Sequence, residues 1–185
     1  MIYFISDLHF NHDKEFVYKP RGFNSISEMN ETLIINWNKT VNKDDTVYVL
    51  GDFFLGTDLE FVEKTLNSLN GSIILIRGNH DTDTKINIYN KSKKILDIKW
   101  ADMIKYNKRN YFLSHFPTLT GNLEGDPKRS IYNLFGHIHS KDKFYEERPY
   151  MYNVAADAHN CTPVSIEQIH KDIDDKIKEC LEQLG

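Results

Sequence analysis

Cysteine is scarce in this sequence of 185 residues, which contains only Cys161 and Cys180. Their separation matches no metal-ligand spacing, so they predict neither a structural zinc site nor a disulfide framework. We expect both to pack as small apolar side chains in a protein of the reduced cytoplasm.

Long apolar runs and a strong charge of one sign are also lacking. No apolar run approaches the ~18 residues of a membrane-spanning helix, and a strand-like segment follows Met1 without a charged leader. We therefore expect a soluble protein that is neither exported by a standard signal nor bound to a membrane. The formal net charge of −4 offers no basic field for nucleic acid, and the 40% hydrophobic and 27% charged content is ordinary for one globular domain, residues 1–185.

Short apolar runs alternate with helical patterns in the first half of the chain. The runs, each suited to a strand buried on both faces, span residues 2–5, 46–50 and 72–76. Between them, one helix is predicted to begin at Ser27, with Ser25 or Ser27 as its cap, and another to run from Gly56 to Leu69. This alternation requires parallel pairing through right-handed crossovers, so the carboxyl ends of the three strands should meet at one edge.

The second half has a different pattern, with short strands and tight turns. After a short helix at Thr82–Asn90, strands over 94–97, 99–106 and 110–113 fit an antiparallel meander. A polar loop is predicted from Thr118 to Arg129. It is followed by strands at 131–135 and 150–154 and an amphipathic helix at 165–184.

Five of the apolar runs end in side chains that can bind a metal ion. In order along the chain, these are Asp7 and His9, Asp52, Asn79 with His80 and Asp81, His115, and His137 with His139. In an extended segment residues two apart project to the same side, so Asp7 and His9 can share one ion. The chain has only eight histidines. Their concentration at strand ends indicates a site.

The types of side chain indicate which ions would bind. Imidazoles, carboxylates and one amide without cysteine suit borderline divalent ions, namely Mn, Fe, Ni, Co or Zn, of which we favour Mn. Leaving out His80 and Asp81, the seven remaining ligand candidates are too many for one ion. Two ions about 3.5–4 Å apart that share a carboxylate account for the number.

Charge counting suggests the substrate. Two divalent ions, two aspartates and a bridging hydroxide leave the site with a charge of about +1, which suits a phosphate mono- or diester attacked by that hydroxide. His80 lies next to Asn79 in the sequence and is placed to protonate the leaving alkoxide, with Asp81 holding its imidazole in orientation.

The motif series resembles the calcineurin-like metallophosphoesterase superfamily, and in particular small stand-alone bacterial and phage members. The matching motifs, in the order of the superfamily, are Asp7-x-His9, Gly51-Asp52, Gly78-Asn79-His80-Asp81, His115 and Gly136-His137-x-His139. The resemblance implies an α/β (α+β) fold, a four-layer αββα sandwich of two mixed β-sheets flanked by helices. It also implies a division of ligands, with Asp7, His9 and His139 on one ion, Asn79, His115 and His137 on the other, and Asp52 bridging. Many members have Glu where Asp81 stands.

Several other side chains have two interpretations. Arg21 and His12 could contact the substrate phosphate together with Asn79, or lie in a solvated loop; the similar small members often carry an Arg-Pro-Phe near the position of Arg21. His159 is predicted either near the site or in ordinary packing, and His170 on the surface. Arg77 could touch phosphate or form a salt bridge at the sheet edge.

The sequence thus predicts a binuclear metal-dependent phosphoesterase acting on small-molecule or nucleotide esters. A nuclease is the alternative within enzymes, ranked lower because no basic stripe or interleaved aromatics mark a track for a strand. A scaffold of the same fold that binds a partner protein without catalysis is the third hypothesis, disfavoured by the intact ligand set and His80. The oligomeric state is not predicted.

Overall fold

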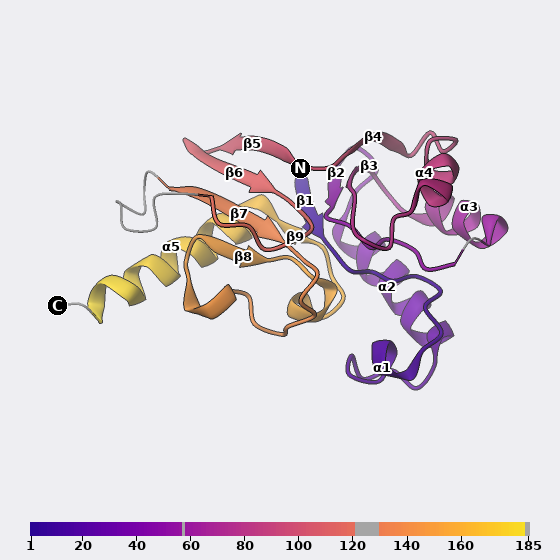
Figure 1. Cartoon of the computed structure of the whole chain (residues 1–185), viewed down its shortest axis with the longest axis horizontal. Helices are drawn as coiled ribbons and strands as arrows, with labels where there is room; N and C mark the ends of the chain where they lie inside the picture. Colours follow the sequence, from indigo (N-terminus) through magenta and orange to yellow (C-terminus); the bar gives the residue numbers. More distant parts are fainter. Residues whose placement is uncertain (57, 121–129, 184–185) are drawn as a thin grey trace.

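Two β-sheets form the centre of the computed structural model, which describes residues 1–56, 58–120 and 130–183 (Figure 1). The first sheet has the order β4-β3-β2-β1-β9, with strands β1 (Ile2–Ile5), β2 (Thr46–Val49), β3 (Ser72–Ile76), β4 (Ile95–Lys99) and β9 (Val164–Ser165). The second has the order β5-β6-β7-β8, with β5 (Asp102–Tyr106), β6 (Arg109–Leu113), β7 (Ile131–Phe135) and β8 (Met151–Asn153). The helices are α1 (Glu15–Tyr18), α2 (Ile26–Thr40), α3 (Leu59–Ser68), α4 (Asp83–Tyr89) and α5 (Ile166–Glu182), with 3-10 turns η2 (Tyr145–Glu147) and η3 (Ala156–His159).

Parallel pairing in the first sheet confirms the predicted strand–helix alternation. Strand β1 pairs with β2, and β2 with β3, in parallel, so that their carboxyl ends lie at one edge. Strand β9 then adds to β1 in the antiparallel direction.

The antiparallel meander predicted over residues 94–113 is correct for β5 and β6 but wrong for β4. Strand β4 pairs in parallel with β3, because α4 carries the chain back across the sheet before β4 begins. Only β5 and β6 form the predicted hairpin, through Asn107 and Lys108 at φ 45° and 68°. Strands β6, β7 and β8 are parallel to one another. The sequence of such a short strand carries little information about whether its partner strand runs parallel or antiparallel to it.

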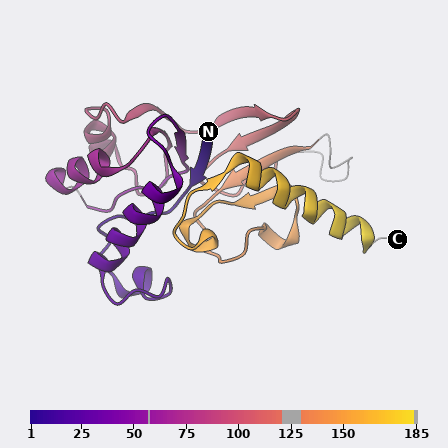
Figure 2. The same ribbon diagram turned by 180° about the vertical axis from the view of Figure 1, so that it is seen from behind.

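Helices flank the two mixed sheets, which confirms the predicted sandwich. Apolar residues of α2, α3 and α4 pack on one face of the first sheet; among them are Met29, Trp37 and Leu66. The opposite face contributes Phe4 and Tyr48 to a second cluster with the second sheet and α5. In Figure 1, α1 to α4 gather on the side of β2, β3 and β4, and α5 lies on the side of β5 to β8; Figure 2 shows α5 from behind, running along the second sheet.

The ends of several elements differ from the predicted ones. Ser25 caps α2 by accepting a hydrogen bond from the Glu28 N–H, whereas α3 begins three residues later than predicted, after the cap Asp58. The short elements α1, η2, η3 and β9 were not predicted. Residues 121–129 of the predicted polar loop lie outside the described residues. Within the described part of the chain, no helix has both the length and the apolar character needed to cross a bilayer.

Candidate metal centre

The carboxyl ends of β1, β2, β3, β6 and β7 meet at one edge, and missing Cβ atoms let them approach closely. A Cβ on Gly136 would lie 1.8 Å from Ser6 Oγ and 2.3 Å from Asp7 Oδ2. A Cβ on Gly78 would lie 2.2 Å from Asp52 Oδ1. Any larger residue at either position would push apart the loops that carry the acids.

One group of ligand candidates comprises Asp7, His9 and His139. Their candidate ligand atoms all lie within 4.8 Å of one another. His9 Nε2 and His139 Nε2 are 3.2 Å apart, and each lies within 4 Å of Asp7 Oδ1, at 3.9 and 3.8 Å. Two ligand atoms that each lie about 2.0–2.2 Å from a shared ion can be up to about 4.4 Å apart, so the three separations are compatible with one ion.

A second group surrounds His115. Its Nε2 lies 2.9 Å from Asn79 Oδ1 and 3.2 Å from His137 Nδ1. Its Nδ1–H donates to the carbonyl of Leu50 at 2.8 Å, which leaves the lone pair of Nε2 facing the other two side chains. Asp7, Asp52 and His115 also have ligand atoms within 4.8 Å of one another.

Asp52 lies between the two groups. Its Oδ2 is 3.7 Å from His9 Nε2 and 3.6 Å from His115 Nε2, and its side chain is only 2% exposed. Its Oδ1 accepts a hydrogen bond from the backbone N–H of His80 at 2.8 Å, so the carboxylate is fixed in orientation. One carboxylate is therefore within reach of both groups.

The backbone beneath the ligands is left-handed at five of the seven positions, which corrects one prediction. Asp7, His9, Asp52, His137 and His139 have φ between 49° and 72°. We expected Asp7 and His9 to share a face because of extended alternation, but a turn brings them together. Such backbone costs of order 1–3 kcal/mol per residue and persists where surrounding contacts hold it.

Burial and unpaired atoms make the two groups suitable for cations. Burial raises the pKa of Asp7, and its Oδ1 has no hydrogen-bond partner among the described residues. Burial, reinforced by His139 and Arg21, lowers the pKa of His9 to about 2, so the ring is neutral as a ligand must be. Burial and His115 also lower the pKa of His137. A buried carboxylate oxygen without a donor, facing the neutral imidazole of His9, fits a divalent ion.

His80 borders this centre, but Asp81 does not orient it as predicted. The His80 side chain is 45% exposed, with Nε2 4.0 Å from Asp52 Oδ2. Both Asp81 oxygens accept hydrogen bonds from other groups: the backbone N–H groups of Asp52, Phe53 and Gly78 and the Tyr89 hydroxyl. Asp81 thus ties the loop after β2 to the turn after β3. Burial raises the pKa of Asp81, although the hydrogen bonds from these backbone N–H groups act to lower it.

Neither interpretation of Arg21 describes its place in the structure. The side chain is 2% exposed and pairs with Asp157, so it lies neither in a solvated loop nor open to substrate. His12 is buried beside the centre, with its ring centroid 5.3 Å from that of His9 and 6.4 Å from that of His80.

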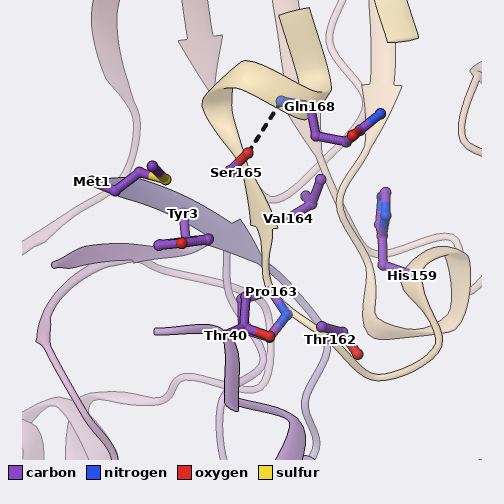
Figure 3. Close-up of a pocket in the computed structure, with 9 residues that line it drawn as sticks. All are labelled: Met1, Tyr3, Thr40, His159, Thr162, Pro163, Val164, Ser165 and Gln168. Atoms are coloured by element: carbon purple, nitrogen blue, oxygen red, sulfur yellow. Dashed lines mark hydrogen bonds between the residues drawn. The ribbon is translucent and has the colours of Figure 1, made fainter. Parts of the chain in front are cut away.

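The remaining candidates have partners other than the candidate ligands. His159 is hydrogen-bonded to the backbone carbonyl of Asn153 and lines a pocket of about 290 Å³ beside β9, together with Tyr3 and Gln168 (Figure 3). His170, expected on the surface, is partly buried, with its Nδ1 2.7 Å from the Tyr111 hydroxyl. Arg77 forms a salt bridge to Asp83, in agreement with its second interpretation, and stacks over Trp100.

Three residues beside the ligands were not predicted from the sequence. Ser6 donates from Oγ to Asp7 Oδ2, and Phe116 places its ring 4.6 Å from that of His137. Asp157 Oδ2 lies 3.1 Å from His139 Nδ1, whereas the sequence pattern points to His159, two residues further along the chain. Their only sequence signal was proximity to a strand end, where an acid or a serine is common without a functional role.

Known proteins are similar to this chain in sequence or in fold. An uncharacterized protein of Methanocaldococcus jannaschii, MJ1445, is 34% identical over 177 residues, which cover 92% of this chain and 89% of that protein. The gene 66 protein of Mycobacterium phage L5 is 33% identical over 81 residues, or 43% of this chain and 39% of that protein. The solved structure of AQ665, a protein of unknown function from Aquifex aeolicus, superposes with a TM-score of 0.70 at 24% identity, over 92% of this chain and 98% of that one.

The fold and the clustered ligands define a metal-binding α/β sandwich protein. The sequence model of the family described as calcineurin-like phosphoesterase matches residues 1–181, and the chain belongs to this family. The superfamily resemblance inferred from the motifs is thereby confirmed.

Proposed function

We propose that the chain is a binuclear metal-dependent phosphoesterase that hydrolyses phosphate mono- or diesters of small molecules or nucleotides. The observation that carries this proposal is the position of Asp52 Oδ2, 3.7 Å from His9 Nε2 and 3.6 Å from His115 Nε2. Asp7, His9 and His139 would hold one ion, Asn79, His115 and His137 the other, and Asp52 both. We favour Mn²⁺ because the carboxylate and amide oxygens suit it, while the imidazoles also suit Fe, Ni and Zn.

The roles of the side chains follow from their exposure. Divalent ions bound at the centre would supply Lewis acidity toward phosphoryl oxygens and activate water. The buried ligands hold fixed positions, whereas His80, 45% exposed, is open to a bound ester. His80 would donate a proton to the departing alkoxide, and His12 would line the same side.

Two exposed aromatic rings support a small ester as the substrate. Phe116 is 49% exposed beside His115 and His137, and Phe16 is 73% exposed beside His12. Rings beside an ion site can stack on an aromatic or nucleobase group. The net charge of −4 gives a nuclease less support, because long polyanions are held mainly by basic side chains.

The direct test is a hydrolysis screen of the metal-loaded chain. Bis-p-nitrophenyl phosphate, p-nitrophenyl phosphate and a single-stranded oligonucleotide would each be assayed with Mn²⁺, Ni²⁺, Zn²⁺ and Mg²⁺, with a chelator as control. We expect turnover of at least one nitrophenyl ester with Mn²⁺ and its loss with chelator. Cleavage of the oligonucleotide alone would favour the nuclease, and no turnover of any ester would leave the non-catalytic scaffold.

A further inference from the structure

Arg21 forms a network of hydrogen bonds behind the centre. Its Nε and Nη2 donate to the two oxygens of Asp157 at 3.0 and 2.8 Å, a bidentate pair in which the side chains are 2% and 9% exposed. Its Nη2 also donates to the carbonyl of Asp7 at 2.7 Å, and Nη1 to the carbonyl of Leu8 at 3.3 Å. The guanidinium thus joins η3 to the turn after β1.

The same pair reaches the third ligand of the first group. His139 Nδ1 lies 3.1 Å from Asp157 Oδ2, while its Nε2 faces His9 Nε2 at 3.2 Å. A hydrogen bond at Nδ1 fixes the tautomer in which Nε2 keeps its lone pair, and it also fixes the plane of the ring. His139 needs this support, because its side chain is 42% exposed and its own backbone is left-handed, with a φ of 49°.

We propose that the Arg21–Asp157 pair is a positioning device for one of the two ions. Arg21 holds the left-handed backbone segment that carries Asp7 and His9, and Asp157 holds His139. One salt bridge therefore supports all three ligands of the first group. The second group has other supports, since His115 donates to the Leu50 carbonyl. This proposal rests on the proposed metal centre. It adds that the ligands of the two ions are held in place by different hydrogen bonds.

Stability alone explains this pair poorly. Burial of two charges carries a desolvation penalty that well-packed apolar residues of similar volume would avoid. The guanidinium fork, by contrast, matches a carboxylate and two carbonyls in a fixed geometry that a lysine cannot reproduce. The fixed geometry of the Arg21–Asp157 pair is suited to positioning the ligands.

The test counts the ions bound by the metal-free full chain and its variants. Wild type, Asp157→Ala, Asp157→Asn and Arg21→Lys would be titrated with Mn²⁺ by calorimetry, with metal content measured after gel filtration and spin coupling between the ions followed by electron paramagnetic resonance. We expect two equivalents and a coupled signal for wild type. For Asp157→Ala we expect one tight equivalent, an uncoupled signal and an affinity of the other ion reduced about 10–100-fold. Asp157→Asn can still accept a hydrogen bond from His139, and Arg21→Lys keeps the positive charge. Both should therefore lose less affinity for this ion than Asp157→Ala.

Arg109 provides the matched control. It pairs with Asp174 of α5 and stacks over Tyr132 in the second sheet, and its side chain is 12% exposed. Arg109→Met therefore breaks a comparable pair away from the centre. It should lower the melting temperature while keeping two Mn²⁺ equivalents.

The outcomes separate this inference from the proposed function. A wild-type chain that binds no Mn²⁺ overturns both. Two equally tight ions in Asp157→Ala, or loss of an ion in Arg109→Met as well, overturns only the positioning role. If Asp157→Ala does not fold, Asp157→Asn and Arg21→Lys decide the matter, because unchanged affinity and coupling in both of them would contradict the proposal.

Discussion

At the scale of single residues, Asp52 connects the two groups of ligands. It is the carboxylate whose one oxygen lies within 4 Å of His9, His80 and His115. The position follows from its neighbours: the N–H of His80 binds Oδ1, which leaves Oδ2 to face the imidazoles. An amide at this position would keep the shape but lose the charge.

Asp52→Asn should therefore abolish turnover and reduce metal content. An amide offers one neutral oxygen to two ions, and the repulsion between the ions is then no longer offset. Hydrolysis assays and metal analysis would check this, with Asp97→Asn on β4 as the control because Asp97 is half exposed and pairs with Lys99. Two full equivalents with normal activity would contradict the bridging role.

His80→Ala should lower kcat by about 10²–10⁴-fold while both ions stay bound. The imidazole lies at the border of the centre and is exposed, as a proton donor to a leaving group should be. Steady-state kinetics with metal analysis would separate kcat from occupancy, and His170→Gln, which changes a histidine of α5, is the control. Loss of both ions from His80→Ala would instead make His80 a ligand.

At the scale of secondary structure elements, the site depends on parallel strands whose ends come unusually close. The loop after β1 and the loop after β7 meet at Ser6, Asp7 and Gly136. The sequence shows Gly136 but not that it lies against Ser6 and Asp7, because the two loops are about 130 residues apart in the chain.

Gly136→Ala should destabilise the fold and lower the affinity for the ion held by Asp7. The new methyl would lie 1.8 Å from Ser6 Oγ, so the loops must move apart, at a cost of about 1–3 kcal/mol. Chemical denaturation and metal titration would measure the two effects. Gly22→Ala, which meets nothing within 4 Å, should cost only its backbone strain and keep both ions.

The contact between β8 and α5 has its own dependence on pH. Asp172 of α5 accepts hydrogen bonds from the Tyr152 hydroxyl, Lys143 and Gln168. Burial works to raise the pKa of Asp172, but these donors outweigh it and hold the pKa below its ordinary value. A lowered pKa in the folded state contributes stability that is present above the unfolded value of about 3.9 and is lost as pH falls through the folded value.

The free energy of unfolding of Asp172→Asn should thus differ from that of wild type most near neutral pH. The difference should shrink as the pH falls below about 4, because protonation removes the same charge from wild type. Urea denaturation at a series of pH values would measure it. Asp175→Asn, an exposed position on the same helix, should show no such trend; a constant difference for Asp172→Asn would contradict the argument.

At the scale of the whole molecule, the candidate ligands come from both sheets. Asp7, Asp52 and Asn79 follow strands of the first sheet, and His115 and His137 follow strands of the second. Ions shared among them would brace the two sheets as well as serve chemistry, since a ligand that binds only the folded state stabilises it.

Removal of metal should lower the melting temperature. At Mn²⁺ concentrations about 100 times Kd the stabilisation is about 2.7 kcal/mol, which for a chain of this size corresponds to roughly 5–10 °C. Calorimetry with and without chelator would measure it. Asp52→Asn should show a smaller shift, and equal melting temperatures for the metal-free and Mn²⁺-loaded wild type would argue against ions shared by the sheets.

The sequence by itself determined the parallel first half of the fold, the family and the set of candidate ligands. Apolar runs of strand length and the chemistry of the residues that follow them are local properties, so they can be inferred without coordinates. The tertiary structure decided which side chains face one another. It turned Asp81 toward backbone N–H groups, buried Arg21 against Asp157, and paired β4, β6, β7 and β8 in parallel. These contacts join residues far apart in the chain, and their partners depend on packing that no local pattern encodes.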